Sequence, residues 1–179
     1  MLKQTLTIAL VAVTAFSVAT PLPAEEPAKA AATAAEQFAR IKKLAGEWVA
    51  ADAPSGEPAR VLVVFRVTAG GSVVQETLFP GTDHEMITMY HVDGDALVLT
   101  HYCAAGNQPR MKARPGPADE AIEFEFAGGA NIDPDVSAHM HSARIEPRGE
   151  DRVRSEWRLF ADGKQQDVKS FDLVRRTGE

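Results

Sequence analysis

The sequence contains only one cysteine, Cys103, so the chain cannot form an internal disulfide. Its stability must therefore come from a packed core, and a chain of 179 residues is long enough to build one. A lone cysteine in such a chain is typical of a small, buried apolar side chain. The residue count gives one domain as the simplest organisation.

Positive charge is also scarce. The 19 Lys and Arg residues are outnumbered by 25 Asp and Glu residues, which gives a formal net charge of -6. Binding to nucleic acid or to an anionic membrane surface requires clustered basic side chains. The composition argues against both kinds of partner.

Long apolar runs are missing except near the start, where residues 5–19 read TLTIALVAVTAFSVA. This run is shorter than the roughly 20 residues that a helix needs to cross a bilayer. It follows Lys3 and ends before the segment Pro21-Leu22-Pro23-Ala24. A short positive start, an apolar stretch and a small residue at its end are the pattern of a secretory signal peptide.

We therefore expect residues 1–24 to be a signal peptide and the mature protein to be periplasmic or secreted, without a membrane anchor. Cleavage removes Lys3 and no acidic residue, so the formal charge becomes -7. Residues 25–33 are alanine-rich and predict a low-complexity linker, and residues 34–179 form the single folded domain.

The cleavage site can be checked directly. The protein recovered from outside the cytoplasm should begin at Glu25, as read by mass spectrometry of the intact chain. Ala24→Arg should leave the precursor uncut, because the peptidase requires a small residue at that position. A full-length exported chain that still carries Met1 would contradict the assignment.

The periodicity of apolar residues changes after Trp48. Before it, Ala34, Phe38, Ile41 and Leu44 recur at helical spacing and predict one helix. After it, apolar and polar residues alternate in short segments, which predicts strands. These segments are 61–67, 73–79, 84–92, 96–103, 110–113, 121–126, 138–146, 153–160 and 167–176.

Tight turns separate these segments, among them Asp93-Gly94-Asp95, a strong hairpin signal. No helical segment lies between them, which argues against a parallel sheet. An antiparallel meander of this length leaves exposed edges unless it closes. The sequence predicts a mainly β fold, an antiparallel up-and-down β-barrel of about ten strands with one N-terminal helix.

The segment Leu44-Ala45-Gly46-Glu47-Trp48 resembles the opening of the calycin superfamily, which includes lipocalins, fatty-acid-binding proteins and nitrobindin-like barrels. The resemblance implies that Trp48 plugs one end of the barrel and that an arginine near the last strand, Arg175 or Arg176, stacks on it. Gly46, Trp48 and Arg175 are then structural residues.

A barrel of this size can hold a small ligand. We expect a small hydrophobic or amphipathic molecule as the partner, bound by a carrier or sensor, and no cofactor. The predicted binding residues are the inward-facing side chains of the strands and polar groups at the mouth: Phe65, Met89, Leu99, His101, Cys103, Asn107, Arg110, Phe124, Phe126 and Trp157.

Two alternatives remain open. His101 and Cys103 share one strand face, and His139 and His141 share another, so together they could bind zinc. Nitrobindin-like barrels bind haem through a histidine near the C-terminus, but this chain has none in its last two segments, so a haem would need another histidine such as His101. The second alternative is a structural or protein-interaction domain whose barrel is filled by its own side chains.

Catalytic signatures are lacking. The sequence has no Gly-x-Ser-x-Gly elbow, phosphate loop or dinucleotide fingerprint. His101 and Cys103 lie two residues apart on one strand, about 7 Å between side chains, so they do not form a nucleophile–base pair. The sequence favours binding over catalysis.

Overall fold

The computed structural model describes residues 30–54 and 59–177, so the predicted signal peptide lies outside the described residues. The described chain forms one α-helix, one short 3-10 helix and ten strands. In order these are α1 (Ala34–Lys42), β1 (Gly46–Ala50), β2 (Val61–Thr68), η1 (Ala69–Gly71), β3 (Val73–Leu78), β4 (Met86–Asp93), β5 (Ala96–Tyr102), β6 (Gln108–Ala113), β7 (Ile122–Ala130), β8 (His139–Pro147), β9 (Arg152–Ala161) and β10 (Lys164–Arg175).

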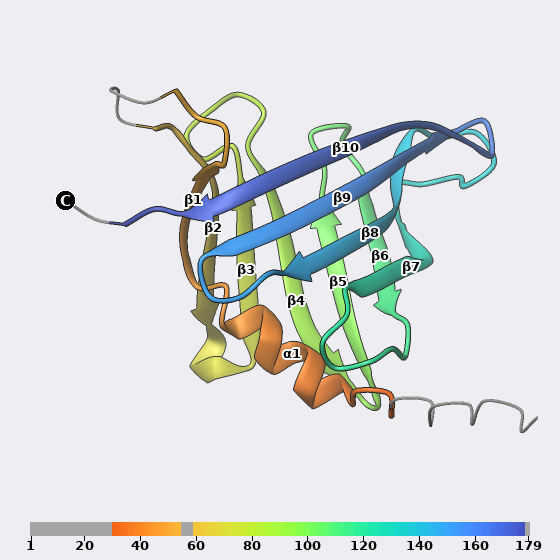
Figure 1. Cartoon of the computed structure of the whole chain (residues 1–179). Coiled ribbons are helices and arrows are strands. Elements are labelled where there is room, and N and C mark those ends of the chain that lie inside the picture. The colour runs from red at the N-terminus through yellow and green to blue at the C-terminus, as the bar shows by residue number, and fades with distance from the viewer. Residues whose placement is uncertain (1–29, 55–58, 178–179) are drawn as a thin grey trace, which may run out of the picture.

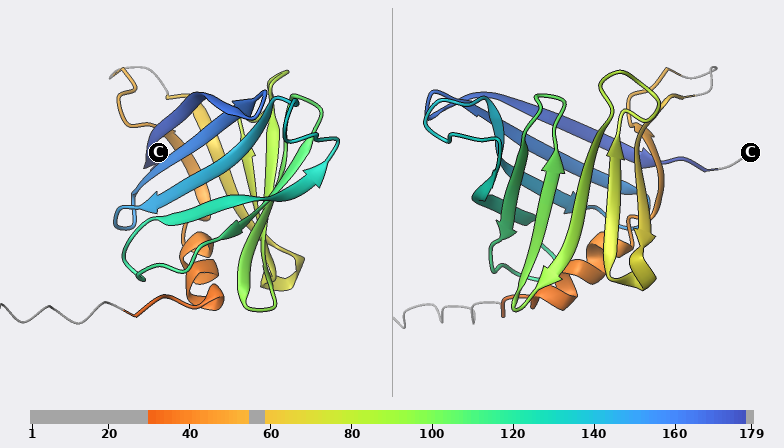
Figure 2. Two further views of the ribbon diagram at one scale, coloured as in Figure 1. Left: turned by 90° about the vertical axis from the view of Figure 1, so that its right-hand side faces the viewer. Right: turned by 180° about the vertical axis from the view of Figure 1, so that it is seen from behind.

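Each strand pairs antiparallel with its neighbours in sequence, and the sheet closes on itself (Figures 1 and 2). The closing strand is β1, which pairs with β2 on one side and with β10 on the other. Trp48 is opposite Val63 in one ladder and opposite Arg175 in the other. The predicted closed ten-stranded antiparallel barrel with a single helix is confirmed.

Helix α1 lies across one end of the barrel, against β4 and β5 (Figure 1). Thr33 and Glu36 form a reciprocal capping box at its first turn. Arg40 and Lys42 lie in its last turn, where their positive charges interact favourably with the negative end of the helix dipole. Its apolar face, with Phe38 and Ile41, is buried in the core. The helix therefore seals this end of the barrel with apolar side chains.

The chain makes ordered contacts just before the helix, within the segment expected as a linker. Ala31 forms a β-bridge with Pro117, and the Ala32 amide donates to the Gly116 carbonyl at 2.8 Å. The folded part thus begins a few residues earlier than residue 34.

Much of the barrel interior is filled. The largest fully buried apolar side chains come from most of the strands and from α1, and they pack as one cluster. Its members with the least exposure include Ile41, Trp48, Tyr90, Leu97, Leu99, Met111, Ile122, Phe124, Ile145, Trp157 and Leu173. Burying a side chain of this size contributes roughly 1.5–3 kcal/mol, so this cluster dominates the stability of the fold.

Trp48 and Arg175 form the contact that ties the helix end to the last strand. The guanidinium carbon of Arg175 lies 4.5 Å from the Trp48 ring centroid, and the indole N–H donates to the Leu44 carbonyl at 2.8 Å. Arg175 also donates to the carbonyls of Lys43, Ala45 and Glu150 at 3.0, 2.7 and 2.8 Å. The Arg175 side chain thereby hydrogen-bonds to backbone carbonyls just after α1 and in the turn between β8 and β9.

Gly46 is required at the start of β1. Its φ of 136° lies outside the range that side chains favour, and a Cβ atom there would come within 2.7 Å of the Arg175 Nη1 atom. The absence of a side chain lets the guanidinium reach the end of the helix.

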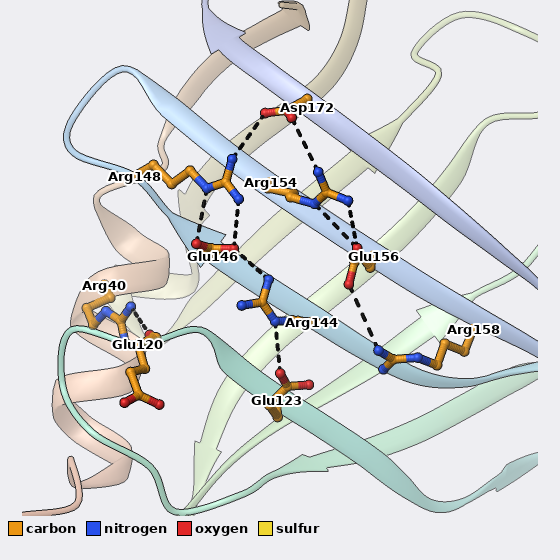
Figure 3. Close-up of polar contacts among 10 residues, drawn as sticks. All are labelled: Arg40, Glu120, Glu123, Arg144, Glu146, Arg148, Arg154, Glu156, Arg158 and Asp172. Atoms are coloured by element: carbon orange, nitrogen blue, oxygen red, sulfur yellow. Dashed lines mark hydrogen bonds and ion pairs between the residues drawn. The ribbon is translucent and has the colours of Figure 1, made fainter.

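The outer face of β7–β10 carries a chain of ion pairs (Figure 3). Arg148 and Arg154 both face Asp172 of β10, and Arg154 also pairs with Glu156 on its own strand. Arg144 bridges Glu123 of β7 and Glu146 of β8. Each pair is partly exposed and weak alone, but the network links four neighbouring strands in one register.

Within residues 30–54 and 59–177, no helix has both the length and the apolar character needed to cross a membrane.

The Arg175 contacts make a prediction about stability. Arg175→Lys should lower the free energy of unfolding by about 2 kcal/mol. A lysine ammonium group cannot donate to all three carbonyls and also stack on the Trp48 indole, as the planar guanidinium does. The measurement is urea denaturation followed by tryptophan fluorescence. Arg176→Lys is the matched control: Arg176 is half-exposed and pairs with Glu47, so its replacement should change stability by less than about 0.5 kcal/mol. Equal effects of the two substitutions would contradict the structural role of Arg175.

Candidate functional site in the barrel interior

A cavity of about 510 Å³ is lined in part by residues at the ends of β3 and β4. The loop that connects these two strands lies at the end of the barrel opposite α1 (Figure 1). Most of the cavity wall is apolar. Its lining residues come from β3, β4, β5, β8, β9 and β10 and from the residue after β3: Leu78, Phe79, Met86, His101, Met140, Trp157, Val168, Lys169, Ser170 and Phe171. The barrel is therefore filled toward the helix and hollow toward the other end.

Two residues of this wall carry buried ring nitrogen atoms. His101 is 1% exposed and Trp157 is 2% exposed, and their rings lie 4.8 Å apart. Among the described residues, neither His101 Nε2 nor Trp157 Nε1 has a hydrogen-bond partner. Buried polar atoms in folded proteins are nearly always paired, because leaving one unpaired costs roughly 1–3 kcal/mol. His101 Nε2 and Trp157 Nε1 are exceptions to this pairing, and both atoms are closed off from solvent.

The other nitrogen of His101 is held by a buried polar network on β3, β4 and β5. His101 Nδ1 lies 2.9 Å from Thr88 Oγ1, and the Tyr90 hydroxyl donates to Glu76 Oε2 at 2.6 Å. Thr88 faces Glu76 in the ladder between β3 and β4 and also hydrogen-bonds to its carboxyl group. The network thus runs from Tyr90 through Glu76 and Thr88 to His101.

Burial shifts the pKa of both titratable ends of this network. The pKa of Glu76 rises to about 7, because desolvation outweighs the hydrogen bonds from Tyr90 and Thr88 that favour the carboxylate. The pKa of His101 falls to about 4, because burial disfavours the imidazolium. His101 is therefore neutral at pH 7.

The ten predicted binding residues separate into distinct environments. His101 and Trp157 line the cavity. Phe65, Leu99 and Phe124 face inward but belong to the filled core, and none of them lines the cavity. The inward direction expected for these five side chains agrees with their burial.

Met89 does not face the interior, so the inward direction predicted for it is wrong, and Arg110 is not among the residues that line the cavity. On β4 the buried side chains are Thr88 and Tyr90, which places Met89 on the outer face. Both faces of β4 carry apolar residues. The polar Thr88 faces inward, where its side chain hydrogen-bonds to His101. Arg110 is exposed and forms an ion pair with Asp93, so it does not reach the cavity.

Cys103 and Asn107 lie in the turn between β5 and β6 and outside the cavity lining. Their backbones pair, with the Cys103 amide donating to the Asn107 carbonyl at 3.0 Å. The Asn107 side chain is buried and donates to the Ala138 carbonyl at 2.8 Å. Asn107 therefore fastens this turn to the segment before β8.

Phe126 contacts both histidines of the His-x-His segment. Its ring centroid lies 4.9 Å from that of His139 and 4.9 Å from that of His141, and Phe160 stacks on His141 at 4.1 Å. We call these four side chains the seam cluster, because they join β7 to β8 beyond the last paired residues, Glu125 and Ser142.

The seam cluster accounts for the two histidines without a metal. His139 Nδ1 donates to the Ser137 carbonyl at 2.7 Å, so the neutral ring accepts at Nε2, where His141 Nδ1 lies 3.0 Å away. Across residues 30–54 and 59–177 no group of three or more His, Cys, Asp or Glu side chains could hold a metal ion. The predicted set of His101, Cys103, His139 and His141 is thus not brought together.

Sequence reasoning missed Glu76, Thr88 and Tyr90. One signal for Glu76 was present: it lies between Val74 and Leu78 on the apolar face of its strand. A carboxylate in that phase indicates a buried polar network. Phe79 was missed because it lies in the loop after β3, and Met140 was missed because a register shift in β8 changes the face to which its side chain points.

A larger hollow of about 800 Å³ lies outside the barrel, between α1 and the turn after β8. Its wall contains the Arg175 guanidinium, already bonded to backbone carbonyls, and Arg40, which donates to the Glu120 carbonyl. These groups are engaged in holding the fold, so the interior cavity is the better candidate site.

A scan against protein-family models, a search of curated proteins and a search of solved structures each give no match. The site is therefore interpreted from its own geometry.

The buried carboxyl makes a prediction about pH dependence. Because the pKa of Glu76 is higher in the folded chain than in the unfolded chain, the folded state loses stability as pH rises from about 4.5 to 7. Glu76→Gln removes this loss. Between pH 4.5 and 7 the free energy of unfolding of the wild type should therefore fall by about 3 kcal/mol relative to that of the variant. Urea denaturation at pH 4.5, 6 and 8 measures the difference.

Comparing the two proteins also cancels the contribution of His101. Its lowered pKa acts in the opposite direction, adding stability as pH rises from about 4 to 6.5, and it is present in both chains. A difference between wild type and variant that stays constant from pH 4.5 to 8 would contradict the raised pKa of Glu76.

Proposed function

We propose that the protein is an exported, non-enzymatic carrier or sensor that binds a small hydrophobic or amphipathic molecule in the cavity of its barrel. The observation that supports this most strongly is a largely apolar cavity of about 510 Å³ lined by residues from six strands of the barrel. Ligand sites typically combine apolar walls with a few polar groups that fix orientation.

The shape of the interior supports binding over a purely structural role. A barrel that served only as a scaffold would fill both ends, since each unfilled volume forgoes packing energy. Here a cavity remains at the end opposite α1, and its wall includes Leu78, Met86, Met140 and Phe171, which belong to the apolar core or pack against it. The apolar lining suits the body of a hydrophobic or amphipathic ligand.

The contact between Trp48 and Arg175 supports the resemblance to calycin barrels, whose members carry small molecules. Gly46, Trp48 and Arg175 have the arrangement that the resemblance implies. The zinc alternative has less support, because His139 and His141 bond to each other and to Ser137 at the seam.

A neutral fluorescent probe, N-phenyl-1-naphthylamine, tests the cavity. We expect one probe to bind per chain with enhanced emission. Met86→Trp should weaken the affinity at least tenfold, because the larger side chain occupies the cavity. Met89→Trp is the matched control on the same strand: Met89 is on the outer face, so probe binding should remain within about twofold.

The proposal fails if the wild type binds no probe, or if the two tryptophan variants bind it equally. Circular dichroism and thermal unfolding of both variants establish that each is folded before the titration.

A further inference from the structure

We propose that two copies of the chain associate through the first half of β10, which pairs antiparallel with the same strand of the second copy about a two-fold axis at Val168. The inference is independent of ligand binding, because it rests on a strand edge and not on the cavity. It is carried by an unpaired backbone edge whose charged side chains are complementary to themselves.

The first half of β10 has a neighbouring strand on one side only. Residues from Lys164 to Val174 pair with β9, whereas β1 pairs with β10 only from Leu173 to Arg175. Figure 1 shows this half of β10 at the end of the barrel away from α1, with β9 beside it. Residues 164–170 are all exposed. Within the described part of the chain, the second edge of this half is therefore open to a further strand.

The backbone of this open edge has groups that can pair. The Asp172 carbonyl accepts from the Ala51 amide at 2.9 Å, which is the side away from β9. Because backbone groups alternate in direction along a strand, Ser170 and Val168 turn theirs to the same side. A regular edge of this kind accepts an extended strand by backbone hydrogen bonding.

A two-fold axis at Val168 brings opposite charges together. Val168 then lies opposite its own copy, and Asp167 lies opposite Lys169 on both sides of the axis. Asp167 and Lys169 are on one face of the strand, where side chains directly opposite each other have Cβ atoms roughly 4.5–5.5 Å apart. In the single chain these two side chains form an exposed ion pair at 2.6 Å. In the dimer each of them gains a second partner of opposite sign.

Neighbouring registers lack this match. An axis at Lys169 places two ammonium groups directly opposite each other, which is destabilising. An axis at Ser170 places Lys169 opposite Phe171 and requires the Asp172 carbonyl, which already accepts from Ala51. The charges of the strand therefore select the register at Val168.

The open edge is only partly protected against pairing. A bulge at Gln166 interrupts the regular ladder, so the strand available for pairing runs from there to Ser170. The Val168 amide donates to Asp167 Oδ1 at 2.7 Å, and in the dimer the Val168 carbonyl of the second copy takes the place of that carboxylate. An edge this short buries less than the roughly 800 Å² per partner of a standard interface, so we expect a weak, reversible dimer.

Sedimentation of the protein without ligand tests the association. From about 10 µM to about 1 mM, the range expected for a small interface, the mean mass should rise from that of one chain toward that of two. Lys169→Glu places two carboxylates opposite each other at both sides of the axis and should weaken the dimer at least tenfold. Asp167→Lys should do the same with two ammonium groups.

Mixing the two single variants separates a charge match from a loss of folding. Each variant alone repels its own copy, but in the mixture Glu at position 169 faces Lys at position 167, and Asp167 faces Lys169. The mixture should therefore form a heterodimer about as stable as the wild-type dimer. Lys112→Glu on β6 is the matched control: it makes the same charge change at an exposed site remote from β10 and should leave the association within about twofold.

Amide hydrogen exchange of the wild type locates the interface without a variant. The Ser170 amide faces the open edge, so its exchange should slow as the protein concentration rises from about 10 µM to about 1 mM. The Phe171 amide faces β9 and should exchange slowly at both concentrations.

Three outcomes overturn the inference. The first is a wild type that stays monomeric over the whole range. The second is a dimer that survives both charge reversals, because it would form through another face. The third is a Ser170 amide already protected in the monomer, because the edge would then be covered by a segment of the same chain.

Discussion

The closure of the barrel at β1 is the constraint on which the rest of the structure depends. This five-residue strand joins β2 to β10, and its central residue, Trp48, packs against Arg175, the last residue of β10 and its partner in the ladder. Arg175 then reaches past Gly46 to carbonyls at the end of α1. Because the first and last strands are far apart in sequence, their pairing is entropically costly to form. A single guanidinium that bonds to the helix end, the Trp48 face and the β8–β9 turn offsets part of that cost.

The interior shows how a barrel combines stability with a site. Large apolar side chains form the core, and a polar network of Glu76, Thr88, Tyr90 and His101 lies on the inner faces of β3, β4 and β5. Burying Glu76 disfavours its ionised form, so the network costs stability at neutral pH. In return, Thr88 holds the buried His101 ring in one orientation and Glu76 accepts from the buried Tyr90 hydroxyl.

The fold could be predicted from the sequence because its determinants are local. Alternating segments, the turn at Asp93-Gly94-Asp95 and the absence of crossover helices require an antiparallel meander, and exposed edges favour closure. The cavity could be predicted only in part. His101 and Trp157 follow from strand phase, but on β4 both faces are apolar, so phase alone could not separate Met89 from Thr88. Contacts across strands, such as Thr88 with His101, decide that choice and have no local signature.

One wall of the barrel differs in how it is held. On β7, only Ile122 to Glu125 pair with residues of β8. Beyond them the two strands are connected by the seam cluster of Phe126, His139, His141 and Phe160. A ladder separates only when several backbone bonds break together, whereas stacked rings part by rotation about single side-chain bonds. Along this wall the sheet is therefore held partly by stacked rings in place of backbone hydrogen bonds, and the Asn107 side chain links the β5–β6 turn to the segment before β8.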